Sequence, residues 1–236
     1  TATLVQDRLG LNCPAMDVVA ACAGFMYALV TGAQYIATGA ARNVLVIGAD
    51  TNTRVLNSDD KKTFPLFGDG AGAAVLRKSE EGEGRILASE TGTDGRHAGL
   101  LDIKGGGSAC PITMVNANDN LATLAMQGRE VFKLAVTAMR KASEKVIERA
   151  GLTPEDITLV VPHQANLRII DAIADRLAVP NEKVFVNLHK YGNTSAAAIA
   201  IALDEAHREG RFKRGDNIIM VAFGAGLTWA ASAIEW

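Results

Sequence analysis

Three widely separated residues have the side chains needed for thiol chemistry. Cys22 lies in the small-residue run 20–25, where an apolar segment meets a helix-like stretch. His163 follows the apolar run 159–161, and Asn193 lies in a turn that contains glycine. A cysteine at a helix start, a histidine after a strand and an asparagine in a turn can activate a nucleophile and hold an oxyanion. The sequence therefore predicts nucleophilic catalysis by Cys22.

Such a cysteine needs its thiolate form to be favoured. A helix N-terminus contributes about 0.3 to 1 kcal/mol, which is less than one pKa unit of about 1.36 kcal/mol. We therefore expect an imidazole such as His163 to supply the rest, or to act elsewhere in the cycle. A small buried apolar role is the alternative for Cys22, and it is the role we expect for Cys13 and Cys110.

Two glycine-containing segments could approach a substrate. The segment 224–226 follows an apolar run ending at Phe223, and its backbone N–H groups could hold an oxyanion. A plain turn is the alternative there. The segment 67–72 looks like a phosphate loop, but it lacks G-x-G-x-x-G and leads into another strand. We interpret 67–72 as a tight structural turn.

The elements that must position these residues alternate along the chain. Short apolar runs predict strands at 43–48, 73–76, 157–161, 184–186 and 218–223. Helices are expected at about 23–38, 120–150, 165–178 and 195–209. This order indicates a mixed or parallel sheet covered on both faces. The polar, glycine-rich stretch 79–108 is the best internal boundary, dividing 1–80 with the nucleophile from 81–236 with the histidine and asparagine.

Composition excludes several classes of function. The 236 residues carry a formal charge of −2 with no basic block, which argues against nucleic-acid binding. Three cysteines without metal-ligand spacing favour a reducing compartment, by default the cytoplasm, and predict no metal site. The segment 18–41 has no charged residue and could span a bilayer. Its many small and polar residues favour instead a helix buried on all sides in a soluble core.

Five motifs taken together resemble the β-ketoacyl-acyl-carrier-protein synthase III family of the thiolase superfamily. They are DVVAACAGF at 17–25, FGDGAGAA at 67–74, PHQANLRI at 162–169, GNTSAA at 192–197 and FGAGLTW at 223–229. The resemblance runs along the whole chain in order. It implies an α/β fold of the thiolase-like, layered αβαβα type, made of two related halves with the first half incomplete.

The resemblance also implies a two-step decarboxylative Claisen condensation that initiates fatty acid synthesis. Cys22 would take an acyl group from acyl-CoA, which is a substrate, so that no cofactor is needed. Malonyl-acyl carrier protein would then lose carbon dioxide while His163 and Asn193 donate hydrogen bonds to the enolate. The N–H groups of Cys22 and Ala225 would hold the oxyanion. Removing His163 or Asn193 should then spare much of the acylation and stop the decarboxylation.

Further roles come from the same resemblance. Asn166 would touch the pantetheine arm, Leu66 and Phe223 would flank the acyl tunnel, and Lys61 would stand where relatives often place an arginine against adenine. Carrier-protein docking would use Lys133, Arg168 and Arg176, and the protein would be a homodimer. The N-terminal part of the family fold, including an aromatic residue that stacks on adenine, has no counterpart in this sequence.

Other functions remain as alternatives. A degradative thiolase needs a second catalytic cysteine late in the chain, and none follows Cys110. A papain-like hydrolase would carry C-G-[SA]-C-[WY], which is missing. Relatives that make polyketide, alkylquinolone or long-chain ketone products use the same three residues, and a non-catalytic paralogue is a further possibility.

Overall fold

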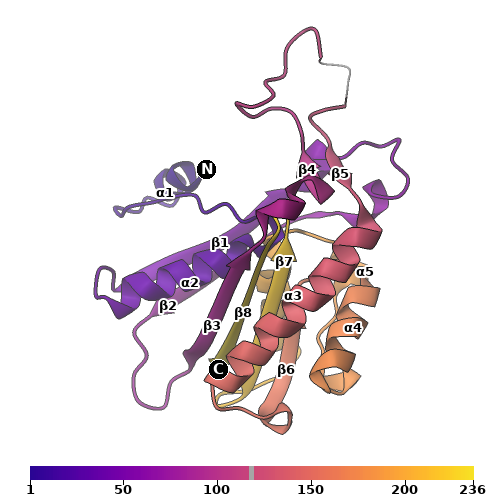
Figure 1. Cartoon of the computed structure of the whole chain (residues 1–236). Helices are drawn as coiled ribbons and strands as arrows, with labels where there is room; N and C mark the ends of the chain where they lie inside the picture. Colours follow the sequence, from indigo (N-terminus) through magenta and orange to yellow (C-terminus); the bar gives the residue numbers. More distant parts are fainter. Residues whose placement is uncertain (117–119) are drawn as a thin grey trace.

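The computed structural model describes residues 1–116 and 120–236 (Figure 1). Its α-helices are α1 (Ala2–Arg8), α2 (Gly24–Ala37), α3 (Gly128–Arg149), α4 (Leu167–Leu177), α5 (Leu188–Tyr191) and α6 (Ala197–Arg208). Its strands are β1 (Asn43–Thr51), β2 (Asp69–Arg77), β3 (Arg85–Thr93), β4 (Leu101–Ile103), β5 (Leu124–Met126), β6 (Ile157–Pro162), β7 (Asn217–Gly224) and β8 (Thr228–Glu235). A short 3₁₀ turn, η1 (Ala21–Ala23), precedes α2.

The larger sheet has the strand order β3-β8-β7-β6. Strands β6 and β7 run parallel, whereas β7, β8 and β3 pair antiparallel. Strands β6 and β7 are continuous apolar runs with almost every side chain buried, as expected where helices cover both faces. Helices α3 and α4 cover one of these faces.

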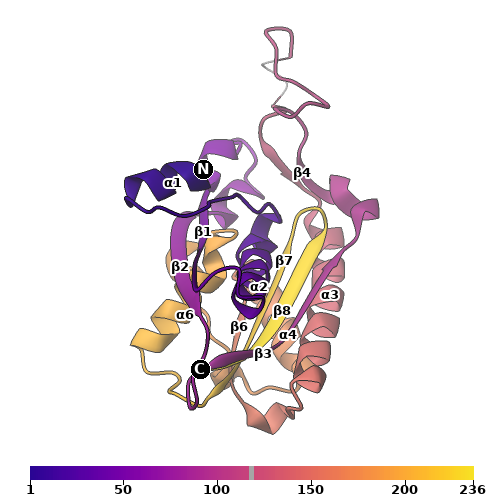
Figure 2. The same cartoon turned by 90° about the vertical axis from the view of Figure 1, so that its left-hand side faces the viewer.

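The smaller sheet is the antiparallel pair of β1 and β2, and α2 and α6 lie between the two sheets. Figure 2 shows this order of layers, with β1 and β2 at the left, α2 in the middle, then β7 and β8, and α3 at the right. Glycines in β2 make the close packing of α6 possible. A Cβ at Gly72 would lie 2.6 Å from the Cβ of Ala200, and one at Gly70 would lie 2.8 Å from Ile201.

The two halves repeat one structural unit. In each, a non-glycine residue with positive φ (Ala21 at 45°, Ser195 at 54°) comes just before a buried helix. The helix leads to a strand that pairs antiparallel with the next one, β1 with β2 and β7 with β8. The predicted α/β fold with thiolase-like layers and two related halves is therefore confirmed, and the sheet of the first half has two strands against four in the larger sheet of the second half.

Two predicted elements were wrong in part. The helix expected at 120–150 begins only at Gly128, because Leu124–Met126 pairs with Leu101–Ile103 as β5. The strand expected at 184–186 is a single bridge between Val184 and Val160. The N–H of Phe185 still donates to the carbonyl of Val160, and the pairing ends before Asn187 and Leu188, whose N–H groups donate to the side chain of Gln164.

The glycine-rich segments also differ from expectation. Most of the predicted tight turn at 67–72 belongs to β2, where its glycines face α6. The predicted boundary segment 79–108 contains a strand that was not predicted, β3, which pairs with β8 over eight positions from Arg85 to Thr93. The polar residues of β3 do not show the apolar pattern of a strand, and the strand is stabilised by its pairing with β8.

Helix α2 lies in the central layer, as predicted, but it is not buried on all sides. Phe25, Met26 and Leu29 are buried, whereas Tyr35 near its end is exposed. Across the described ranges 1–116 and 120–236, none of the helices has both the length and the apolar character needed to cross a membrane.

Candidate active site

A cavity at one end of the larger sheet brings the three predicted catalytic residues together. Cys22, His163 and Asn193 all line it, although they come from η1, the end of β6 and the turn before α6. Leu66, Asn166 and Phe223, which were also predicted to bind substrate, line the same cavity. The remaining wall is largely apolar and comes from α3, β4 and β5.

The turn that carries Cys22 is held by the loop between β7 and β8. A Cβ at Gly224 would lie 2.7 Å from the backbone nitrogen of Cys22, so only glycine fits at this position. Thr228 Oγ1 donates to the carbonyl of Ala20 at 3.0 Å and lies 3.1 Å from the carbonyl of Ala225. The predicted oxyanion residue Ala225 is therefore in a loop that packs against the nucleophile turn.

His163 directly follows β6, as predicted. Its backbone N–H donates to the carbonyl of Val221 at 2.7 Å, which continues the parallel pairing with β7. The side chain is 2% exposed, and its Nδ1 is buried without a hydrogen-bond partner. The ring is therefore fixed by packing rather than by a charged neighbour.

Burial keeps both the thiol and the imidazole uncharged. Desolvation raises the pKa of Cys22 to about 11, a hydrogen bond from Ser195 opposes this shift, and the nearby charge of Asp50 adds to it. Desolvation also lowers the pKa of His163 to about 4. A neutral ring brings no positive charge to a thiolate, which favours the second of the two roles predicted for His163, an action elsewhere in the cycle.

Asn193 is held so that its amide donor is available. Its Oδ1 accepts from the N–H of Ser195 at 2.9 Å, its own N–H donates to the carbonyl of Leu66 at 2.8 Å, and its carbonyl accepts from the N–H of Gly68 at 3.0 Å. Gly68 must be glycine, since a Cβ there would collide with the carbonyl of Tyr191. With Oδ1 occupied locally, Nδ2 is the group that Asn193 can offer to a ligand.

The other predicted site residues are distributed around the cavity. Asn166 caps α4, its Oδ1 accepting from the N–H of Ile169 at 3.0 Å. Lys133 on α3 and Arg168 on α4 are exposed next to cavity-lining residues, whereas Arg176 lies about 12 Å further along α4. Lys61 is outside the cavity lining, in an exposed loop, and its Nζ donates to the carbonyl of Ser58.

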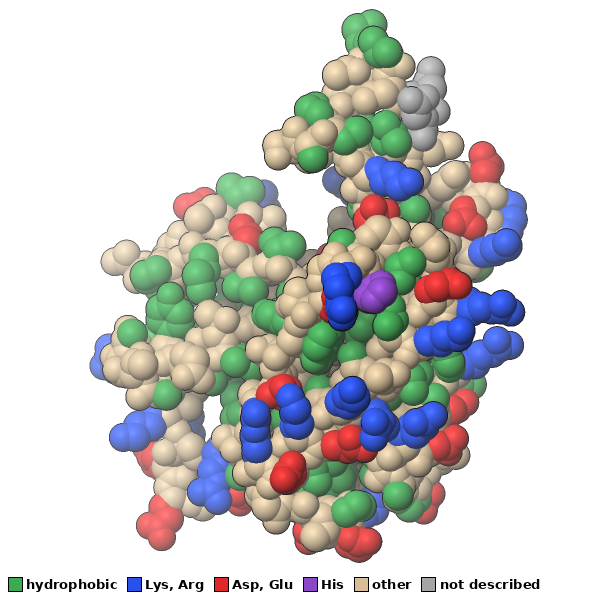
Figure 3. Space-filling view, viewed as in Figure 1, with side chains coloured by type: hydrophobic (Ala, Val, Ile, Leu, Met, Phe, Trp, Pro, Cys, Tyr) green, Lys and Arg blue, Asp and Glu red, His purple; other side chains and the backbone are tan. Residues whose placement is uncertain are grey.

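The face of the molecule that carries α3 and α4 has many charged side chains. Figure 3 shows Lys and Arg side chains gathered, with some Asp and Glu among them, on the face that α3 and α4 cover. Lys133, Arg168 and Arg176 belong to these two helices. Among the basic residues of α3, Arg140, Lys145 and Arg149 pair with Glu144 or Glu90, whereas Lys133 lies next to cavity-lining residues.

Two cysteines are less buried than the sequence predicted, and two residues near the site were not predicted at all. Cys13 is exposed rather than buried, and Cys110 is half-buried. Ser195, whose side chain lowers the pKa of Cys22 against the effect of burial, and Gln164, which is buried beside His163, were not singled out. Serine and glutamine have no distinctive spacing in the sequence, so only their contacts show their importance.

Layers of this kind, with a cysteine at the start of a central helix, define the class of thiolase-like condensing enzymes. Residues 16–95 match the 3-oxoacyl-[acyl-carrier-protein] synthase III family, and residues 147–236 match its C-terminal domain family. A β-ketoacyl-[acyl-carrier-protein] synthase III of Caldanaerobacter subterraneus is 54% identical over all of this chain and 71% of its own length. The chain belongs to the β-ketoacyl-acyl-carrier-protein synthase III family of acyltransferases.

Solved structures agree with this assignment. The 3-oxoacyl-[acyl-carrier-protein] synthase III of Aquifex aeolicus superposes with a TM-score of 0.91 at 47% identity, covering 100% of this chain and 71% of that one. The priming β-ketosynthase of the R1128 polyketide pathway gives a TM-score of 0.88 at 38% identity, covering 99% and 69%. The chain thus spans about seven tenths of the length of these relatives.

Proposed function

We propose that this chain condenses an acyl-CoA primer with malonyl-acyl carrier protein to initiate fatty acid synthesis. The observation that carries the proposal is the convergence of Cys22, His163 and Asn193 on one apolar cavity. Three residues so far apart in sequence meet there only through the fold. A nucleophile and two hydrogen-bond donors in a dry site suit a reaction that passes through an acyl-enzyme and an enolate.

In the first step, Cys22 sulfur attacks the thioester carbonyl of acyl-CoA. The C–S bond to CoA breaks, the acyl group stays on Cys22, and the proton lost by the thiol ends on the CoA thiol. The start of α2 and the Ser195 hydroxyl favour the thiolate against its burial. The N–H groups of Cys22 and Ala225 hold the oxyanion of the tetrahedral intermediate.

In the second step, malonyl-acyl carrier protein loses carbon dioxide, and the electron pair of the broken C–C bond forms an enolate. A neutral imidazole can donate a hydrogen bond to the thioester oxygen without giving up its proton, which suits the low pKa of His163. Asn193 Nδ2 is the second donor. The carbanion carbon then attacks the Cys22 thioester, releasing 3-oxoacyl-acyl carrier protein and a thiolate that takes up a proton.

The carrier protein would dock on the face formed by α3 and α4. Lys133 and Arg168 flank cavity-lining residues and suit an acidic partner that delivers its pantetheine arm past Asn166. Arg176 would contact the partner further from the cavity. Leu66 and Phe223 would contact the acyl chain, and Lys61 the CoA adenine. The predicted homodimer stays a prediction, which light scattering in solution would test.

Intact-mass measurement after incubation with a panel of acyl-CoAs tests the first step. We expect one acyl mass added to the wild-type chain and none to Cys22→Ala, with Cys13→Ala as the matched control that acylates normally. Malonyl-acyl carrier protein should then remove that mass and yield 3-oxoacyl product. Loading without malonyl-dependent product would point to a transferase or hydrolase, and no loading at all would contradict the proposal.

Priming of a polyketide pathway is a second candidate. It is favoured by the similarity to the R1128 priming β-ketosynthase. Both candidates share the chemistry and differ in the carrier protein that accepts the new chain. Comparing kcat/KM for malonyl groups on fatty acid and polyketide carrier proteins would separate them.

A further inference from the structure

Gln164 is the most completely bonded side chain beside the catalytic cavity. It is fully buried, and Nε2 donates to the carbonyls of Pro162 at 2.8 Å and Phe185 at 3.1 Å. Its Oε1 accepts from the N–H groups of Asn187 at 3.0 Å and Leu188 at 3.2 Å. A primary amide can make two donor and two acceptor bonds of this kind, so its capacity is used in full.

These four bonds join the two loops that carry the hydrogen-bond donors. Pro162 immediately precedes His163 at the end of β6. Leu188 begins α5, and its carbonyl accepts from the N–H of Gly192 at 2.8 Å, one residue before Asn193. Gln164 therefore connects the His163 loop to the Asn193 turn through one buried side chain.

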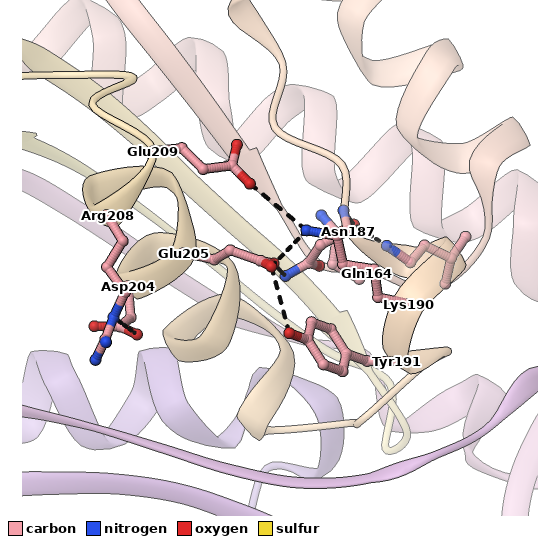
Figure 4. Close-up of polar contacts among 9 residues, drawn as sticks. Gln164, Asn187, Lys190, Tyr191, Asp204, Glu205, Arg208 and Glu209 are labelled. Atoms are coloured by element: carbon pink, nitrogen blue, oxygen red, sulfur yellow. Dashed lines mark hydrogen bonds and ion pairs between the residues drawn. The ribbon is translucent and has the colours of Figure 1, made fainter.

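A second group of contacts holds α5 from the other side (Figure 4). Glu205 on α6 accepts from Asn187 Nδ2 at 2.8 Å, from Lys190 Nζ at 2.6 Å and from Tyr191 Oη at 3.3 Å. Its side chain is 18% exposed, so water screens these contacts only partly. Helix α6 begins at Ala197, shortly after Asn193. Polar contacts therefore fix α5 to the His163 loop through Gln164 and to α6 through Glu205.

We propose that Gln164, supported by Glu205, is a positioning residue that sets the spacing between the His163 ring and the Asn193 amide. Two donors that act on one enolate oxygen must be placed together, and an error of 1 Å can cost about 100-fold in rate. Cys22 is held by different contacts, those of the β7–β8 loop. Gln164 should therefore matter for decarboxylation and little for acylation, an expectation that rests on the proposed function.

Gln164→Met tests this, because methionine has a similar length and makes none of the four bonds. We expect malonyl decarboxylation to fall about 100-fold while the rate of Cys22 acylation stays within about twofold of wild type. Gln164→Glu keeps the acceptor for Asn187 and Leu188 and loses both donors, so it should also decarboxylate slowly. Decarboxylation within twofold of wild type, or an equal loss in both half-reactions, would overturn the proposal.

Glu205 and Glu209 provide a matched pair on one helix. Glu205→Leu removes all three contacts to α5, and we expect decarboxylation to fall about 10-fold. Glu209→Gln removes only the 3.5 Å contact with Lys190, and activity should stay within about twofold. Equal effects of the two variants would argue against the support assigned to Glu205.

An NMR measurement separates this inference from the proposed function. In protein labelled with ¹⁵N-histidine, the His163 ring signals, identified by their loss in His163→Ala, should shift or broaden in Gln164→Met and stay unchanged in Glu209→Gln. Unchanged signals in Gln164→Met would overturn the positioning role, whatever the activity. If the wild-type chain lacks decarboxylation while the signals do move, the proposed function fails and the positioning role stands.

Discussion

The four-stranded sheet and the β1–β2 sheet differ in how well they are covered. In the larger sheet, the parallel strands β6 and β7 bury nearly every side chain. In the smaller sheet, the inner face packs on α2 and α6, while Leu45, Ile47 and Val75 on the outer face are 41%, 39% and 67% exposed. Apolar strand residues contribute to stability only as far as they leave water, so the larger sheet must provide most of it.

The catalytic residues are divided between the two halves that carry these sheets. His163 and Asn193 belong to the better covered half, whereas Cys22 belongs to the half with the smaller sheet. The buried residues around Cys22, such as Ala20 and Phe25, share one core cluster with Met220 and Ala222 of β7. The nucleophile is therefore held by the core of the other half, whereas the two donors are held by local contacts of their own loops, so losing a donor and losing the nucleophile should affect different half-reactions.

The largest expected effect is the difference between variants of Cys22 and Asn193 in the two half-reactions. Asn193→Asp keeps an oxygen for the Ser195 N–H but lacks the Nδ2 donor, so decarboxylation should fall about 100- to 1000-fold, as when an oxyanion donor is lost. Acylation should change by no more than a few-fold, in contrast to its complete loss in Cys22→Ala. Rapid-quench assays of each half-reaction measure this, and normal condensation by Asn193→Asp would refute the assigned donor.

The pH dependence of acylation sharpens the comparison further. With the pKa of Cys22 near 11 and that of His163 near 4, about one thiol in ten thousand is ionised at pH 7. The thiolate fraction grows tenfold per pH unit below its pKa, so acylation should speed up about 100-fold between pH 7 and 9. His163→Ala should show the same slope. A plateau above pH 7 would instead reveal a thiolate–imidazolium pair.

Stability should also differ between the two sheets. Ile219 in β7 is fully buried and Ile47 in β1 is 39% exposed. We expect Ile219→Ala to lower the free energy of unfolding by about 2 to 5 kcal/mol and Ile47→Ala by less than about 1 kcal/mol. Urea titrations of both variants measure this. Equal losses would mean that the outer face of β1 is covered in solution.

The smallest expected effect concerns the cationic face. Arg168→Glu should raise the KM for malonyl-acyl carrier protein several-fold, and Arg176→Glu should do so less, because it lies further from the cavity. Acylation by acyl-CoA should be unchanged in both variants. The difference between the two should shrink at high salt, and an equal effect on acyl-CoA would contradict docking at this face.

The strands and helices rich in apolar residues could be predicted from local pattern. Strands β1, β6 and β7 and helices α2, α4 and α6 lie where periodicity placed them, within a few residues. Strands β3, β4, β5 and β8 were not predicted in this way. Strand β3 is largely polar, β4 and β5 have three residues each, and β8 is rich in small residues. Each becomes a strand because a neighbouring strand offers a partner.

The sequence by itself determined the family, the type of reaction and the three residues that line the cavity, because these depend on residue types in a fixed order. Tertiary structure alone decided the charge states, since the pKa values of Cys22 and His163 follow from burial. It also decided which side chains hold the site together. A glutamine or a serine has many possible partners, and only the packed fold selects the ones that Gln164 and Ser195 bond.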